Sequence, residues 1–227
     1  LRTMKKLRVL VLVHETLVPP EDVSGYTVQQ IDEWRTEYDV TTSLRAMGHE
    51  VRVLGMGDNL AELRSAITDW QPDVSFNLLE EFHGETVYDH NVVAYLELIK
   101  VPYTGCNPRG LMLSRGKALS KKLLTYHRIR VPDFAVFPLG RKVKRPRHLA
   151  FPLIVKSLIY ESSTGISQAS VVANEDQLNK RVQFVHDTIG TAAIVEQFID
   201  GRELYAGVLG NDRLRVFPVW EMSFAKM

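Results

Sequence analysis

Strand-like and helix-like hydrophobic patterns alternate through the first hundred residues. Residues 8–13 form an unbroken apolar run rich in β-branched side chains, which is typical of a strand buried on both faces of a parallel sheet. Further strands are predicted at 50–54 and 74–78, with helices between and after them at 28–47, 60–70 and 85–98. Because strand and helix alternate with short connections, residues 4–105 are predicted to form an open α/β domain.

The first predicted helix carries signals at both ends. Thr27 and Gln30 have the spacing of a capping box, in which each side chain satisfies a backbone N–H at the start of a helix. Gly48 stands where a glycine commonly ends one.

After residue 110 the pattern changes. A lysine-rich helix is predicted at 111–127, with Leu119, Leu123 and Leu124 facing inward. One further helix is predicted at 175–186, among strands at 134–137, 153–156, 169–172, 192–198 and 204–209. Many strands with few helices indicate an antiparallel sheet with helices on one face, which is an α+β arrangement.

Composition narrows the class of protein. The chain has 227 residues, enough for two domains, and 45% of them are apolar. Its net charge of +1 removes the main argument for a nucleic-acid partner. No apolar run approaches the roughly 20 residues of a membrane helix, so no membrane partner is expected. The single Cys106 cannot form an internal disulfide, so a reducing, cytoplasmic location is expected.

Lys156 is the first candidate functional residue, because a lysine ends the otherwise apolar run 151–156. A buried charge without a partner costs several kcal/mol, so either the strand end reaches solvent or the ammonium meets an anion such as phosphate. Ser162, Ser163 and Gly165 follow closely. Small residues let backbone N–H groups approach phosphate, although many plain turns have the same composition.

Residues 196–199 are the second candidate, because they close a predicted strand before an acidic residue. Their main-chain groups could face a flat base, with apolar cover from Phe198 and Ile199, and Glu203 could accept hydrogen bonds from ribose hydroxyls. The alternative is a surface strand followed by a hairpin turn at Asp200-Gly201.

Six motifs in order resemble the ATP-grasp superfamily, and within it the D-alanine–D-alanine ligase-like branch. They are Glu81–Glu85, Val101–Cys106, Lys117–Lys122, Phe151–Lys156, Ser162–Gly165 and Val195–Glu203. The resemblance implies an N-terminal, Rossmann-like α/β (pre-ATP-grasp) domain followed by α+β ATP-grasp lobes. The implied divisions are 4–110 for the N-terminal domain, 111–191 for the central lobe and 192–227 for the start of an incomplete C-terminal lobe, with ATP between the last two.

The resemblance also implies individual roles. The ATP-binding residues would be Lys117 and Lys156 at the phosphates, Ser162, Ser163 and Gly165 in the loop over them, Glu196, Gln197 and Ile199 at the adenine beside Phe198, and Glu203 at the ribose. The catalytic residues on the side of the first substrate would be His83, Glu85 and Glu37.

The implied reaction uses ATP to phosphorylate a carboxylate, after which an amine attacks the acyl phosphate. The cofactors would be ATP and Mg²⁺, which bridges phosphate oxygens. The substrates would be a small carboxylate and an amine, both resembling amino acids. A homodimer through the N-terminal domain is implied by analogy alone.

The chain departs from the family pattern in three places. The family's metal ligands lie beyond the equivalent of Met227, so no metal ligand is expected here and residues 1–227 alone are expected to be inactive. Gly116 replaces an aspartate that usually precedes the first lysine. Residues 14–20 replace the Gly-Gly-Ser loop of D-alanine ligases, so the first substrate is not expected to be D-alanine. A non-catalytic ATP-binding or regulatory module is the alternative.

Two other candidate sites have less support. His14 and Glu15 follow a predicted strand and could bind a metal, but no third ligand stands at useful spacing. Cys106 with His83 could suggest a thiol nucleophile, but a small residue buried near a hinge between domains is the simpler interpretation of Cys106.

Overall fold

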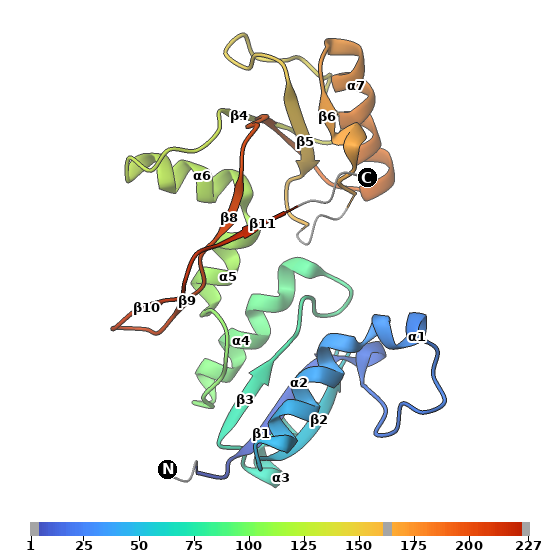
Figure 1. The fold of residues 1–227 in the computed structure, drawn as a ribbon, viewed down its shortest axis with the longest axis vertical. Coiled ribbons are helices and arrows are strands. Elements are labelled where there is room, and N and C mark those ends of the chain that lie inside the picture. The colour runs from blue at the N-terminus through green and yellow to red at the C-terminus, as the bar shows by residue number, and fades with distance from the viewer. Residues whose placement is uncertain (1–4, 161–164, 224–227) are drawn as a thin grey trace. The chain divides into compact units, whose positions relative to one another are not determined.

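A computed structural model describes residues 5–160 and 165–223, which divide into two compact units (Figure 1). Among the described residues, the first unit contains 5–129 and 157–160, and the second contains 130–156 and 165–223. No helix within these described ranges is long and apolar enough to cross a membrane.

The first unit is built on a three-stranded parallel sheet in the order β2-β1-β3. The strands are β1 (Arg8–His14), β2 (Glu50–Met56) and β3 (Val74–Asn77). An isolated parallel bridge from Ser75 to Tyr103 extends the edge beside β3. The central strand β1 is buried at five consecutive positions, which explains its unbroken apolar run.

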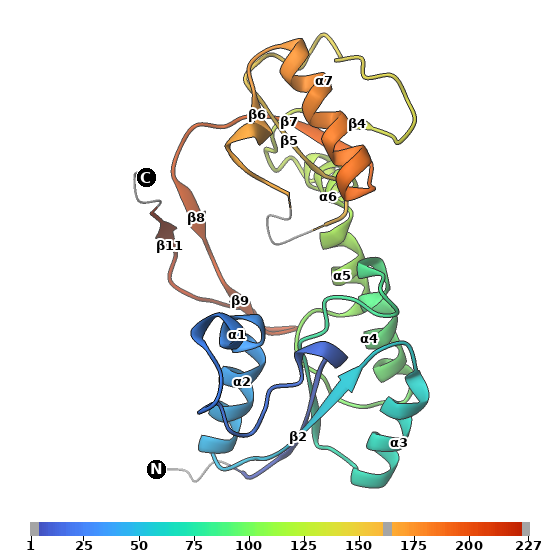
Figure 2. The ribbon, with the colours of Figure 1, turned by 90° about the vertical axis from the view of Figure 1, so that its right-hand side faces the viewer.

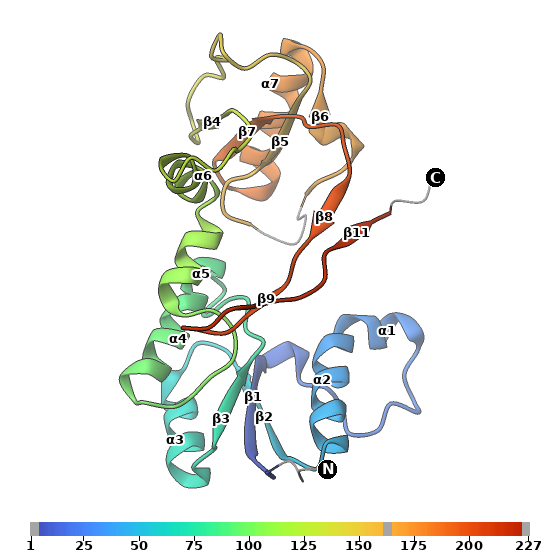
Figure 3. The same ribbon diagram turned by 60° about the vertical axis from the view of Figure 1, so that its left-hand side comes forward.

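Helices cover both faces of this sheet (Figures 2 and 3). Val9, Val11 and Val13 pack in a cluster with Leu44, whereas Leu10 and Leu12 belong to a separate cluster on the opposite face. The helices are α1 (Val28–Glu33), α2 (Arg35–Ala46), α3 (Leu60–Trp70), α4 (Asp89–Leu98), α5 (Pro108–Arg115) and α6 (Lys117–Tyr126), with short 3₁₀ turns at Glu15–Leu17 and Thr86–Tyr88. Leu44 comes from α2, and α3 and α4 supply the other cluster, so successive β1 residues face different helices.

The helix predicted at 28–47 is two helices, α1 and α2. The break is at Trp34, whose backbone is not helical (φ −126°, ψ 22°). Trp34 is buried, and its ring meets Tyr26 and Tyr38 edge-on at centroid distances of 5.5 and 5.8 Å. The capping box of Thr27 and Gln30 is confirmed. Packing of one large aromatic therefore overrides the helical pattern at this point.

The helix predicted at 111–127 is also two helices, α5 and α6, which meet at Gly116 (φ −78°, ψ 70°). The prediction that the leucines of α6 face inward is wrong. Leu119, Leu123 and Leu124 are 50%, 40% and 37% exposed. Periodicity finds an apolar side of a helix but does not show that another element covers it.

The second unit contains a four-stranded sheet in the order β4-β7-β5-β6. Its strands are β4 (Phe134–Phe137), β5 (Leu153–Ser157), β6 (Val171–Val172) and β7 (Ala193–Gln197), and the β4–β7 and β5–β6 pairs are antiparallel. A 3₁₀ turn (Gln168–Ser170) precedes β6, and α7 (Glu175–Phe184) continues into a π-helical turn, Val185–Ile189. Leu178 and Val182 of α7 pack against Leu153, Val155 and Val195 of the sheet, which is the predicted α+β arrangement.

The stretch predicted as one strand at 204–209 is instead divided between two hairpin-like ladders. β8 (Glu203–Tyr205) pairs with β11 (Trp220–Met222), and β9 (Val208–Leu209) pairs with β10 (Arg215–Val216), both antiparallel.

Leu12 offers a test of the core of the first unit, since its side chain is fully buried. We expect Leu12→Ala to lower the free energy of unfolding by about 2–5 kcal/mol, because it removes buried apolar surface and leaves a cavity. Urea denaturation followed by tryptophan fluorescence measures this, because Trp70 belongs to the same cluster. Leu98→Ala is the control: Leu98 is 79% exposed, and equal effects of both changes would contradict the assignment.

Candidate functional site

A cleft of about 390 Å³ opens at the carboxyl ends of β1 and β3 in the first unit. Its polar lining residues come from three places: the end of β1 with its 3₁₀ turn, the α1–α2 region, and the loop after β3. They are His14, Thr16, Glu33, Thr36, Glu37, Glu80 and Glu81. The chain after β1 crosses one face of the sheet and the chain after β2 crosses the other, and ligands of open α/β sheets bind at such a switch point.

Glu37, predicted as a catalytic residue, lies in this cleft. It belongs to the first turn of α2, and only 7% of its surface is exposed. Within the described part of the chain, it makes no hydrogen bond or ion pair. The cleft therefore contains a buried carboxylate whose capacity to accept hydrogen bonds is unused.

His14, considered above as a metal ligand, instead pairs with Glu81. Its Nε2 lies 3.1 Å from Glu81 Oε1, and its Nδ1 lies 2.7 Å from Thr16 Oγ1. No three His, Cys, Asp or Glu side chains of the described residues converge on a point that could hold a metal ion. The arrangement fixes the imidazole at the edge of the cleft.

His83 and Glu85 do not line this cleft. His83 and Gly84 are the central residues of a tight turn, closed by reciprocal N–H···O=C bonds between Phe82 and Glu85. Both central residues have positive φ (58° and 74°), as a type I′ turn requires. The His83 side chain is 63% exposed, and its Nδ1 lies 3.8 Å from Asp58. Their catalytic roles remain predictions.

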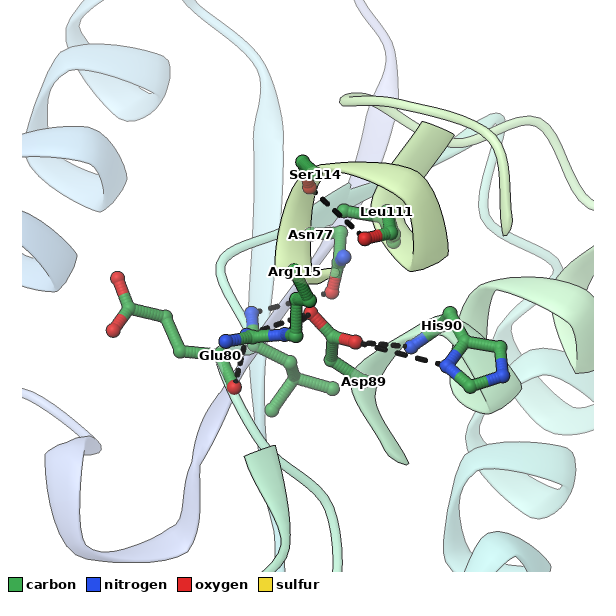
Figure 4. A network of polar contacts seen from close by, with 8 residues as sticks. Asn77, Glu80, Asp89, His90, Leu111, Ser114 and Arg115 are labelled. Atoms are coloured by element: carbon green, nitrogen blue, oxygen red, sulfur yellow. Dashed lines mark hydrogen bonds and ion pairs between the residues drawn. The ribbon is translucent and has the colours of Figure 1, made fainter. Parts of the chain in front are cut away.

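A buried arginine links three elements beside the cleft (Figure 4). Arg115, at the end of α5, donates from Nε to Asp89 Oδ2 at 2.9 Å and from Nη2 to the Glu80 carbonyl at 2.5 Å. Asp89, the first residue of α4, is 3% exposed and also accepts from the N–H of His90. The pair therefore fixes the end of α5 and the start of α4 to the loop carrying Glu80. Sequence reasoning missed it, because 26 residues separate the partners.

Lys117 begins α6, and its ammonium donates to the Tyr160 carbonyl within the same unit. The bond brings the predicted phosphate-binding lysine to the chain immediately before residue 161. Ser162 and Ser163 lie outside the described residues.

Lys156, the predicted lysine of the second unit, has an acidic partner. Its Nζ lies 3.2 Å from Glu196 Oε2 across the neighbouring strands β5 and β7. The Glu196 side chain is 6% exposed and the Lys156 side chain 27%. Lys156 thus both pairs with an acid and keeps part of its surface open, so an anion could still approach it.

The predicted adenine-binding residues lie at the carboxyl end of β7. The N–H of Gln197 donates to Asp133 O at 2.8 Å, and the N–H of Phe198 donates to Pro152 O at 3.1 Å. Both donors are engaged within the unit, so a base would have to use other groups, such as the Gln197 carbonyl and the Ile199 amide. Ile199 is 59% exposed.

Glu203, the predicted ribose acid, begins β8. Its carboxylate accepts a hydrogen bond from the Tyr205 hydroxyl, which raises the pKa of Tyr205. Glu203 therefore already acts as an acceptor toward a hydroxyl group.

Gly165 is held by a buried arginine. Arg181 Nη2 donates to the Gly165 carbonyl and, at 2.7 Å, to Ser170 Oγ. Burial lowers the pKa of Arg181. Gly165 has φ +70°, a backbone conformation that favours glycine, and a Cβ there would also displace the end of the Ile189 side chain.

The Arg181 contacts can be tested by stability. We expect Arg181→Met to lower the free energy of unfolding by about 1–3 kcal/mol, because the buried Ser170 hydroxyl and the Gly165 carbonyl lose a charged donor. Chemical denaturation measures this. The control is Lys180→Met, since Lys180 has a 75% exposed side chain paired only with its helical neighbour Asp176; an equal loss there would contradict the role of Arg181.

Comparison with known proteins gives sequence relatives along most of the chain. The family model for the D-ala D-ala ligase C-terminus matches residues 123–227. The chain is 32% identical over 199 residues to a D-alanine–D-alanine ligase of Syntrophotalea carbinolica, covering 87% of this chain and 61% of the relative. It is 31% identical over 195 residues to the uncharacterized protein y4sG of Sinorhizobium fredii, covering 82% and 55%. The chain thus spans between 55% and 61% of the length of these curated relatives.

Solved structures share the fold at low sequence identity. The D-alanine–D-alanine ligase from Bacillus anthracis complexed with ATP has a TM-score of 0.72 and 21% identity, over 97% of this chain and 67% of that one. The L-amino acid ligase from Bacillus licheniformis has a TM-score of 0.64 and 16% identity, over 96% and 50%.

Proposed function

We propose that this chain, an ATP-grasp protein related to the D-alanine–D-alanine ligases, forms part of an ATP-dependent carboxylate–amine ligase that acts through an acyl phosphate. The sequence relatives and the shared fold confirm the resemblance predicted from the six motifs. The observation that carries the proposed function is the Lys156–Glu196 pair, which holds a partly accessible ammonium beside the predicted adenine segment. A non-catalytic module is not favoured, because named relatives are ligases.

The ATP contacts follow from the residues at the end of β5 and β7. Lys156 supports a phosphate oxygen, and Lys117 does the same from the start of α6. The Gln197 carbonyl and the Ile199 amide receive the adenine edge, and Glu203 accepts from the ribose. Gly165, held by Arg181, ends the loop over the phosphates.

In the proposed reaction, a carboxylate oxygen of the first substrate attacks the γ-phosphorus of ATP, and ADP leaves. The amine nitrogen of the second substrate then attacks the acyl carbon, phosphate leaves, and the nitrogen loses a proton. Both lysine ammoniums would offset negative charge that develops on the phosphoryl oxygens.

The residues described here do not fit a magnesium site. No three of their His, Cys, Asp or Glu side chains form a metal-binding group. We therefore assign no step to Mg²⁺, although ATP is expected to bring it.

The three-part division at 4–110, 111–191 and 192–227 belongs to the same proposal, and so do the homodimer and the cytoplasmic location. The compact units divide the chain differently, because residues 111–129 fall in the first unit. We propose that the first unit binds the first substrate through the cleft that contains Glu37.

Lys156 tests the nucleotide site. We expect Lys156→Met to weaken ATP binding at least about tenfold, since a charged hydrogen bond contributes roughly 1.5–3 kcal/mol. Isothermal titration calorimetry measures the affinity, and circular dichroism checks folding, because Glu196 loses a partner. Lys180→Met makes the same change at an exposed position of the same unit; unchanged ATP affinity in Lys156→Met would disprove the assignment.

His83 tests the reaction. We expect the complete gene product to release ADP when carboxylate and amine substrates from an amino-acid panel are present. His83→Asn should slow that turnover and leave ATP affinity unchanged, because Asn-Gly keeps the type I′ turn while removing the imidazole. Wild-type turnover in His83→Asn would show that His83 serves the turn alone, and ATP binding without any carboxylate-dependent turnover would favour the non-catalytic module.

A further inference from the structure

We propose that the cleft at the carboxyl ends of β1 and β3 binds a substrate with two protonated amines, and that this substrate is a basic amino acid. That this ligand is a substrate rests on the proposed function, whereas its binding depends on the cleft alone.

The charged residues that line the cleft are predominantly acidic. Four glutamates line it, Glu33, Glu37, Glu80 and Glu81, and the described lining residues include no lysine or arginine. A cleft lined by one sign of charge raises the local concentration of ions of the opposite sign. The field therefore selects a cation.

Glu37 differs from the exposed acids of the cleft because it is buried. Its side chain is more than nine-tenths buried and, among the described residues, has no partner. Neither of its carboxylate oxygens is among the fully buried polar atoms without a partner, so the carboxylate keeps some access to the cleft. A charge with so little water around it still costs free energy. An ammonium, which has three donors and no acceptor, would remove that cost through a charge-assisted hydrogen bond.

The remaining acids favour a second cationic nitrogen. Of the four glutamates, His14 contacts Glu81 alone, at 3.1 Å. Glu33 and Glu80 stand exposed at the rim of the cleft with no cation among the described lining residues, and their field attracts a second positive charge. An α-amino acid with a cationic side chain supplies two ammonium groups and also the carboxylate that the reaction needs.

A metal ion is the competing occupant, and the geometry disfavours it. A divalent cation needs several oxygen ligands converging at about 2–2.6 Å, but no three acids or histidines of the described chain are arranged to hold one. Acids spread around about 390 Å³ instead match an extended organic cation.

The position of the cleft is an independent argument. His14 ends β1, and Leu78, Glu80 and Glu81 follow β3, so the cleft stands outside the carboxyl ends of two adjacent parallel strands. The sheet fixes this place, because chain direction and crossover sides determine it. The Arg115 bond to the Glu80 carbonyl holds one wall.

Binding of L-lysine and of L-norleucine, which lacks the side-chain amine, tests the proposal by calorimetry on the complete protein without ATP. We expect L-lysine to bind at least about tenfold more tightly, and added salt to weaken it. Equal affinities, or no binding of L-lysine, would overturn the proposal.

Glu37→Gln should reduce L-lysine affinity at least about tenfold while raising the melting temperature, because it removes a buried charge. Glu62→Gln is the matched control, since Glu62 is exposed on α3, and it should change neither. If Glu37→Gln does not fold, Glu33→Gln at the exposed rim replaces it, with a smaller loss of affinity expected. Unchanged L-lysine affinity in the folded variant would refute the assignment.

ATP titrations of the same proteins separate the two proposals. Glu37→Gln should keep wild-type ATP affinity. If L-lysine binds and ATP does not, the proposed ligase function fails and the cationic cleft stands; if ATP binds and L-lysine does not, the cleft proposal fails alone.

Discussion

Burial of charge constrains both units of this protein, because an ion taken out of water must meet an opposite charge or lose several kcal/mol. In the first unit, Arg115 and Asp89 meet at 2.7 Å, and the arginine also reaches the Glu80 carbonyl. In the second unit, Lys156 and Glu196 meet across neighbouring strands. Each pair fixes backbone segments that are distant in sequence, and each lies beside a candidate binding site.

Two buried charges depart from this pairing. Among the described residues, Arg181 donates only to the Gly165 carbonyl and the Ser170 hydroxyl. Glu37 is nearly as buried as the paired acids and has no partner among the described residues. Stability alone would favour an uncharged side chain there. A charged group kept at such a cost is a common feature of binding sites. The Arg115 network fixes the loop that carries Glu80, another lining residue of the same cleft, and we interpret the cleft as the ligand-binding part of the first unit.

The pattern of apolar and polar residues predicted secondary structure better than it predicted which side chains would be buried or paired. The parallel sheet, the capping box at Thr27 and the α+β character of the second half were all predicted. The breaks at Trp34 and Gly116 were not, because a helix break decided by ring packing or by one glycine leaves the apolar spacing on either side intact. The exposed leucines of α6 were missed for a related reason: spacing identifies an apolar face and not its neighbour.

The sequence by itself showed the resemblance to the ATP-grasp superfamily and suggested the candidate ligands of ATP, since motif order and spacing are properties of the chain. It also placed Lys156 at the end of an apolar strand, where a charged group must either reach solvent or meet an anion. Only the tertiary structure decided which partner each charge has. It paired Lys156 with Glu196 and His14 with Glu81, placed Glu37 in the cleft, and put His83 in a turn. Such pairings depend on distances between residues far apart in the chain, and hydrophobic pattern carries no information about those distances.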